Sequence, residues 1–231
     1  GIGERLSVED TRAMMCVRIN SLVKGHSGIQ KKVVQQIVEY LNADIIPVVP
    51  RLGSLGASGD LAPLSHMALA LIGEGEVWRN GVPTPTSEVL REKGMIGVEL
   101  GAKDGLSLIN GTSQMCSLLV RADNCLANLI PMADLIACVS LEAIECSIQP
   151  MDPRVHEVRP HHGQSLVAER ISYIMKNSQI IEHHLDCDKV QDAYSFRCIP
   201  QVHGAVLERY RNLSNTLDSE INRATDTPLI G

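Results

Sequence analysis

The sequence has 231 residues and a formal net charge of −6, with 44% hydrophobic and 3% aromatic residues. A chain of this length can bury one large core, and this hydrophobic content excludes a disordered protein. Charges of both signs are scattered, and neither a basic run nor an aromatic platform is present, so a nucleic-acid partner is not expected. With so few aromatic residues, the core must consist mainly of aliphatic side chains.

The seven cysteines are an odd number and form no Cys-x-x-Cys pair. We therefore expect free thiols in a reducing compartment rather than a disulfide framework or a zinc site. Four of them lie in helix-like stretches and should be small buried hydrophobic residues: Cys116, Cys125, Cys138 and Cys146. No apolar run reaches bilayer length and the first residues lack signal-peptide character, which predicts a cytoplasmic protein without a membrane partner.

The first expected elements are two helices. Ser7-Val8-Glu9-Asp10 resembles a capping box, so one helix should begin there, and Gly25-His26-Ser27-Gly28 should interrupt it. Apolar residues at helical spacing predict a second helix over about residues 29–41. Two prolines make residues 45–50 a short extended connection.

A glycine-rich loop at residues 51–60 precedes a helix expected over residues 61–71, with Asp60 at its N-cap. The Asn80-Gly81 pair then predicts a small hairpin over residues 76–83. A short helix is expected over residues 86–93.

The second half of the chain is expected to be helical throughout. One long helix should cover residues 111–146, with a bend at Pro131. Apolar residues surround most of that helix, so it should be buried in a bundle or against other subunits. Two more helices are expected over residues 164–182 and 201–223, so the fold class is mainly α with a small β-hairpin.

Several functions compete for the glycine-rich loop. It is not a phosphate loop, because no Gly-Lys-Ser/Thr follows, and it is not a dinucleotide fingerprint, because GxGxxG is absent. It fails the GxSxG nucleophile elbow because Asp60 occupies the place of the second glycine. From spacing alone, a flexible turn leading into a helix is the favoured interpretation.

A self-made ring is another interpretation of Ala57-Ser58-Gly59. Attack of the Gly59 nitrogen on the Ala57 carbonyl carbon would close a five-membered ring, and loss of water and of the Ser58 hydroxyl would leave an exocyclic methylidene. Glycine suits position 59 because the backbone must fold back without a Cβ atom. The helix beginning near Leu61 would direct the positive end of its dipole at this electrophile.

Four segments together carry a more specific resemblance. Residues 53–64 look like the cofactor-forming segment of the histidine and phenylalanine ammonia-lyases, and residues 108–112 contain an Asn-Gly-Thr element like theirs. Residues 191–204 resemble the long substrate-binding signature, and residues 220–229 a further element. The chain thus resembles the aromatic amino acid ammonia-lyases along nearly its whole length, and most closely those that act on histidine.

The resemblance implies a long-helix bundle of the ammonia-lyase/fumarase-like type and a methylidene-imidazolone made from Ala57, Ser58 and Gly59, with no external cofactor. It implies the reaction of L-histidine to urocanate and ammonia, in a homotetramer. It also implies that residues 1–231 are the central part of a single catalytic domain whose N- and C-terminal portions are absent, so this segment alone should be inactive.

The same resemblance assigns roles to four further residues. Arg197 would clamp the substrate carboxylate, unless it is a solvated surface arginine. Asn110 would lie near the electrophile, or else cap a helix. Tyr194 would be a polar or proton-transfer partner, or else a core tyrosine, and Gln191 would contact the substrate or the loop.

Histidines bear on two further points, the choice of substrate and the possibility of a metal site. His203 stands where histidine-type members have a similar sequence, which favours histidine over phenylalanine. The alternatives are a phenylalanine or tyrosine lyase or an aminomutase with the same cofactor, and a catalytically silent helical segment. The adjacent pairs His161-His162 and His183-His184 lack the spacing that places ligands on one helix face, so no metal site is expected.

Overall fold

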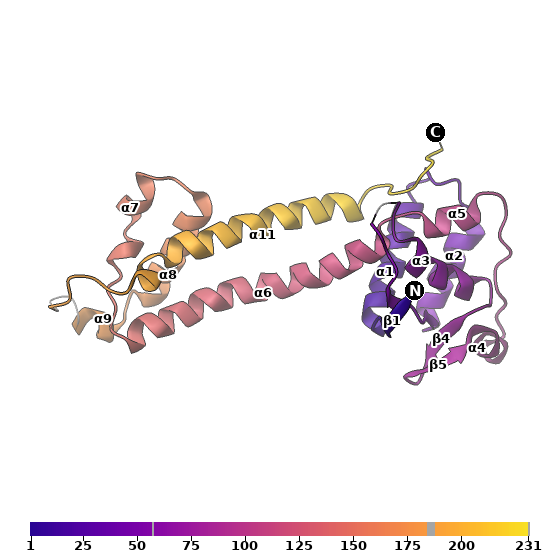
Figure 1. Cartoon of the computed structure of the whole chain (residues 1–231), viewed down its shortest axis with the longest axis horizontal. Coiled ribbons are helices and arrows are strands. Elements are labelled where there is room, and N and C mark those ends of the chain that lie inside the picture. The colour runs from indigo at the N-terminus through magenta and orange to yellow at the C-terminus, as the bar shows by residue number, and fades with distance from the viewer. Residues whose placement is uncertain (57, 184–187, 231) are drawn as a thin grey trace. The chain divides into compact units, whose positions relative to one another are not determined.

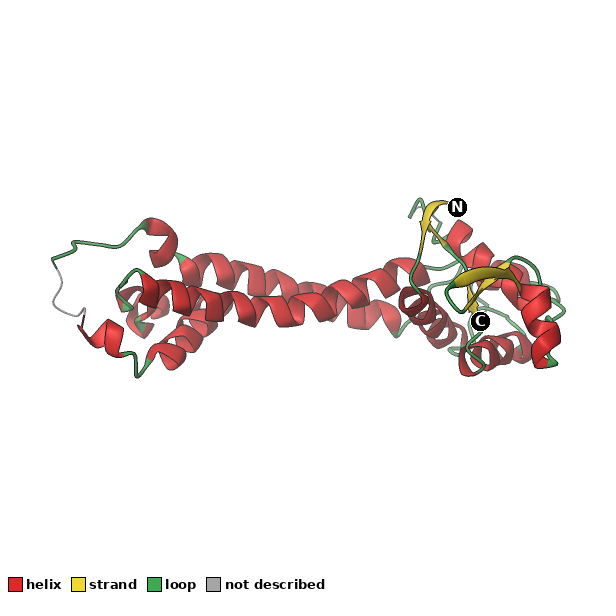
Figure 2. Cartoon of the chain, turned by 90° about the horizontal axis from the view of Figure 1, so that it is seen from below, coloured by secondary structure: helices red, strands yellow, loops and turns green. Residues whose placement is uncertain are grey.

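The computed structural model describes residues 1–56, 58–183 and 188–230. It is mainly helical, with two small antiparallel sheets, which confirms the predicted fold class (Figure 2). The chain divides into two compact units, Gly1–Arg121 with Thr216–Gly231, and Ala122–Asn215. Each unit is described by itself.

The first unit contains helices α1 (Val8–Leu22) and α2 (Lys31–Asn42) (Figure 1). The Ser7 hydroxyl oxygen accepts a hydrogen bond from the Asp10 amide over 3.0 Å, so the predicted capping-box start is confirmed. Tyr40 on α2 is fully buried, and its hydroxyl donates to the Ala70 carbonyl oxygen over 2.9 Å. This bond joins α2 to the helix that follows the glycine-rich loop.

Two small sheets complete the frame of the first unit. Strand β1 (Ile2–Arg5) pairs antiparallel with β3 (Pro50–Leu52), and β4 (Glu76–Arg79) lies between β2 (Ile46–Pro47) and β5 (Val82–Pro85). Asn80 and Gly81 connect β4 to β5 with φ angles of 50° and 78°, so the predicted Asn-Gly hairpin is confirmed. Helix α4 (Thr86–Lys93) follows, as expected.

Helices α3 (Leu61–Leu71) and α5 (Asp104–Ile109) pack together on this frame. The bounds of α3 match the prediction. The core beneath them is aliphatic, as the composition requires, and its fully buried members include Met14, Ile37, Leu64, Met67 and Leu108.

Two long helices follow the expected pattern, α6 (Ser113–Ala143), which contains Pro131, and α11 (Ile199–Ile221). An apolar stripe on α6 stays exposed at i, i+3 and i+4 spacing. Its members are Leu129, Met132, Leu135, Ile136 and Val139, which are 45–61% exposed. The burial expected for this helix is therefore not provided along this stripe by the described residues of the chain.

The second unit adds short elements around these helices: η1 (Gln149–Met151), α7 (Pro153–Glu157), α8 (His162–Met175), α9 (Gln179–His183) and α10 (Tyr194–Arg197). The single helix expected over residues 164–182 is wrong. Helix α8 ends at Met175, and Ser178 starts α9 by accepting a hydrogen bond from the Ile181 amide over 3.3 Å. Serine competes for backbone groups in this way and favours a cap over a helix interior.

Two sequence expectations need correction, one about the burial of the cysteines and one about the length of apolar stretches. Cys116, Cys138 and Cys146 are buried, but Cys125 is exposed, because it lies on a different face of α6. The stretch Asp104–Ala143 is long and apolar enough to cross a bilayer by length and composition, so the expectation that no apolar run reaches that length is wrong. The core helices of soluble proteins pass the same test.

Candidate active site

Gly59 lies directly before α3 and against the Asn-Gly-Thr element. Its φ angle is +89°, and a methyl group added to it would lie 2.6 Å from the Gly111 carbonyl oxygen. Both the backbone conformation and the space therefore require glycine at this position. Ser58 precedes it, and Ala57 lies outside the described residues.

Asp60 ties three segments together. Its amide donates to the Gly111 carbonyl oxygen over 2.7 Å, its Oδ1 accepts from the Ser54 hydroxyl over 2.6 Å, and its Oδ2 accepts from the Met115 amide over 2.9 Å. The side chain is fully buried. Asp60 is the N-cap residue of α3, as predicted, but its carboxylate makes no capping bond to that helix because these other donors occupy it.

Asn110 is the C-cap residue of α5, at the start of the Asn-Gly-Thr element. Its side-chain amide donates to the Thr227 carbonyl oxygen over 2.7 Å. The backbone of Asn110 thus ends a helix, as the alternative interpretation expected, while its side chain binds the segment after α11. Ser58, Gly59 and Asn110 all belong to the first unit.

Arg18 is a polar residue of this region that the sequence analysis missed. It is fully buried on α1, and its Nη2 donates to the carbonyl oxygens of Ser107 and, over 3.1 Å, Asn110. Burial lowers the pKa of Arg18 to about 10, although the carboxylates of Asp226 and Asp60 act in the opposite direction. One sequence signal existed, because Arg18 falls at helical spacing with the apolar residues of α1.

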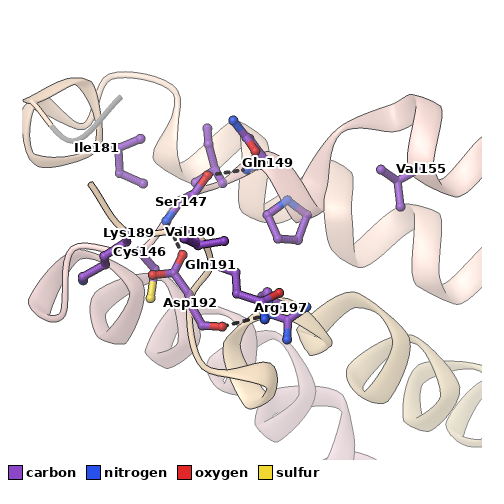
Figure 3. Close-up of a pocket in the computed structure, with 12 residues that line it drawn as sticks. Cys146, Ser147, Gln149, Val155, Ile181, Lys189, Val190, Gln191, Asp192 and Arg197 are labelled. Atoms are coloured by element: carbon purple, nitrogen blue, oxygen red, sulfur yellow. Dashed lines mark hydrogen bonds between the residues drawn. The ribbon is translucent and has the colours of Figure 1, made fainter. Parts of the chain in front are cut away.

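The remaining predicted site residues belong to the second unit. Gln191 and Arg197 line a pocket of about 570 Å³ together with residues on both sides of η1 (Figure 3). The Arg197 Nε donates to the Asp192 carbonyl oxygen over 2.9 Å, and its guanidinium carbon lies 5.3 Å from the centre of the Tyr194 ring. Tyr194 is 70% exposed in this chain.

The buried residue Cys146 also lines this pocket. Burial, and secondarily the Asp192 carboxylate, raise the pKa of Cys146 to about 11. The Asp192 carboxylate also accepts a hydrogen bond from the Ser147 amide over 2.8 Å, which fixes the loop on which Gln191 lies. The pocket thus joins an arginine, an amide side chain and a protonated thiol.

His203 has a structural partner in the second unit. Its Nδ1 lies 2.7 Å from Oδ1 of Asp134, and Arg170 donates to the other oxygen of that carboxylate. Asp134 is fully buried, so its charge requires such partners. The identity of residue 203 is therefore tied to this ion-pair cluster as well as to the motif that favoured histidine as the substrate.

The two histidine pairs considered as metal ligands belong to different segments of the chain. His161 and His162 lie at the start of α8 and His183 ends α9, while His184 lies outside the described residues. Over the residues that the structure describes, no group of three His, Cys, Asp or Glu side chains gathers in a way that could hold a metal ion.

The sequence profile of the aromatic amino acid lyases matches residues 1–231, so the chain belongs to the aromatic amino acid lyase family. It is 44% identical over 234 residues to a histidine ammonia-lyase from Myxococcus xanthus, a match that covers 100% of this chain and 45% of that relative. The chain therefore spans less than half the length of this relative.

Solved structures agree with this assignment. The histidine ammonia-lyase of Trypanosoma cruzi has a TM-score of 0.89 and 38% identity, over 100% of this chain and 42% of its own. The tyrosine aminomutase of Streptomyces globisporus has a TM-score of 0.91 and 36% identity, over 100% of this chain and 47% of its own. Lyases and aminomutases thus share this fold.

Proposed function

We propose that residues 1–231 are the central part of a longer, single catalytic domain that eliminates ammonia from L-histidine to give urocanate. The observation that carries the proposal is the fit of Gly59 against Gly111, where a left-handed backbone leaves no room for a side chain. The 44% identity to a histidine ammonia-lyase supports the choice of reaction. A cytoplasmic location, as for soluble metabolic enzymes, is part of the proposal.

The described residues at the end of the loop support ring formation. Gly59 has the backbone freedom that ring closure needs, and Asp60 holds the end of the loop in place through Gly111, Ser54 and Met115. The ring, once formed from Ala57, Ser58 and Gly59, would supply an electrophilic methylidene that makes the amino group a leaving group. Residues fixed in this way do not have to reorganise during the reaction.

Arg197 is the proposed carboxylate clamp. Its Nε donation to the Asp192 carbonyl oxygen and its contact with the Tyr194 ring hold the guanidinium, and the two terminal nitrogens match the two oxygens of a carboxylate. Gln191 lines the same pocket and can contact the substrate. The exposure of Tyr194 is what a substrate-contacting group requires, and we assign it polar or proton-transfer contact.

Asn110 is the proposed polar contact beside the electrophile. It follows α5 and precedes Gly111, which is bonded to Asp60, so its position in the chain is fixed relative to Gly59. The Thr227 carbonyl oxygen restricts its amide group. A fixed amide can orient the amino or carboxylate end of an amino acid.

We also propose that the whole enzyme is a homotetramer. The exposed apolar stripe on α6, from Leu129 to Val139, is unusual for a surface helix. Its i, i+3, i+4 spacing is suited to packing against another long helix. Copies of the same chain would bury this stripe. Residues 1–231 span only 45% of the length of a histidine ammonia-lyase relative, so we expect this segment alone to show no turnover.

A phenylalanine or tyrosine lyase or an aminomutase is the second candidate. The TM-score of 0.91 to a tyrosine aminomutase favours it, because the same fold supports that reaction. The Ala-Ser-Gly segment is common to both candidates, so only the product distinguishes them.

The test is a pair of assays on the full-length protein. With histidine, urocanate absorbance should appear, while phenylalanine and tyrosine should give neither cinnamate-type products nor β-amino acids at a comparable kcat/KM. Ser58→Ala should abolish turnover while the circular dichroism spectrum stays unchanged. A higher kcat/KM with phenylalanine or tyrosine would establish the second candidate instead.

A further inference from the structure

A charged side chain lies buried beneath the Asn-Gly-Thr element. Arg18 is 0% exposed, although arginine is almost never fully buried without partners. The charge is near the carboxylates of Asp60 and Asp226, which oppose the lowering of its pKa. An arginine kept at such a desolvation cost points to a specific task at this place.

The contacts of Arg18 define that task. Its Nη2 donates to the carbonyl oxygens of Ser107 and Asn110, at the end of α5. Nε and Nη1 are buried without a hydrogen-bond partner among the described residues. A methyl group added to Gly111 would overlap Nη1, so the guanidinium occupies the place of a side chain at position 111.

Gly111 connects this guanidinium to the ring-forming loop. On one side, Arg18 limits the position of the Asn110-Gly111 backbone; on the other side, the Gly111 carbonyl oxygen accepts the Asp60 amide at 2.7 Å. The same oxygen would lie 2.6 Å from a methyl group on Gly59. A shift of this backbone would therefore be transmitted to Gly59 and Asp60.

We propose that Arg18 is a positioning residue that holds the Asn110-Gly111 backbone against Gly59, so that the loop closes its ring. This inference rests on the proposed function of Ala57-Ser58-Gly59. Arg18 acts through Gly111 and has no role in contacting the amino acid. Its effect should therefore fall on the fraction of chains that carry the ring and not on the affinity of the finished site.

The test compares Arg18→Lys with Arg12→Lys in the full-length protein. Lysine keeps the positive charge but cannot present a planar guanidinium to both carbonyl oxygens. Arg12 is a matched control, because it lies on the same helix and donates to a carbonyl at the end of another helix, Leu41 O over 3.3 Å. The readouts are the mass of the peptide that contains residues 57–59, histidine turnover, and circular dichroism.

We expect folded Arg18→Lys protein in which the fraction of peptide lacking two waters falls at least about tenfold, because small displacements of reacting groups have large effects on rate. Turnover should fall in proportion, and the KM for histidine should change less than about threefold. Arg12→Lys should match the parent in all three readouts.

Three results would overturn the inference: a parental ring fraction in Arg18→Lys, an equal loss in Arg12→Lys, or an Arg18→Lys protein that does not fold. The last would show that Arg18 supports the whole unit rather than the loop. A parent protein without the two-water loss would contradict the proposed function itself, which separates the two failures.

Discussion

The amide nitrogen of Asp60 donates to the carbonyl oxygen of Gly111 over 2.7 Å, which joins the end of the ring-forming loop to the Asn-Gly-Thr element. Two motifs that lie far apart in the sequence are thereby held against each other. The backbone of Gly59, immediately before Asp60, is placed against the same oxygen.

Gly59→Ala should prevent ring formation. The added methyl group would lie 2.6 Å from the Gly111 oxygen in a backbone with φ of +89°. Gly25→Ala is the control, because Gly25 has a φ of +84° but nothing within 4 Å of an added methyl group, so it carries only the conformational cost of roughly 1–2 kcal/mol. Peptide mass and urocanate assays should show loss in the first variant alone; a cyclised, active Gly59→Ala protein would disprove the packing argument.

Arg197→Lys should reduce kcat/KM for histidine by at least about 2 kcal/mol, or roughly thirtyfold, because lysine cannot make the two-pronged carboxylate contact. Arg154→Lys is the control, since Arg154 forms an exposed pair with Asp152 outside the pocket. Steady-state kinetics of both variants provide the measurement. A change of less than about threefold at position 197 would make that arginine structural.

His203→Ala should affect stability more than substrate choice. Removal of the imidazole takes away one of the two partners that the described residues give the buried Asp134 carboxylate, at an expected cost of about 1–3 kcal/mol. Urea unfolding measures the loss, and the ratio of kcat/KM for histidine to that for phenylalanine measures specificity. If that ratio reversed while stability stayed at the parental level, residue 203 would be a specificity determinant.

The free energy of unfolding should fall as the pH rises from 9.0 to about 11, because burial raises the pKa of the Cys146 thiol from 9.0 to about 11. In that window the unfolded chain releases the thiol proton while the folded chain retains it, so stability present at lower pH is lost. Unfolding midpoints for the parent and Cys146→Ala across this window test the effect. The variant should show a shallower decline, and identical slopes would exclude a contribution from this thiol.

The sequence predicted most helices because their signals are local. The Ser7 capping box and the Asn80-Gly81 turn act within a few residues, and both were confirmed. The break between α8 and α9 was missed, because Ser178 competes with helix continuation by a hydrogen bond that spacing of apolar residues does not reveal.

The site was predicted as a set of motifs, and its long-range partners were not. Asp60 was expected to cap α3, yet its carboxylate accepts hydrogen bonds from Ser54 and Met115. Folding brings these two donors to the carboxylate, and the capping pattern does not reveal them. Arg18 gave no motif, and its role depends on carbonyl groups of α5, ninety residues away in the sequence. Such contacts cannot be derived from periodicity.

The mass of the full-length protein shows directly whether the ring forms. Closure of Ala57-Ser58-Gly59 into a methylidene-imidazolone removes two water molecules, and the missing mass should map to the peptide with these residues. We expect this loss in the active parent and no complete loss in inactive Ser58→Ala, which lacks the leaving hydroxyl. Histidine turnover by a parent protein with its full encoded mass would show that catalysis does not depend on the ring.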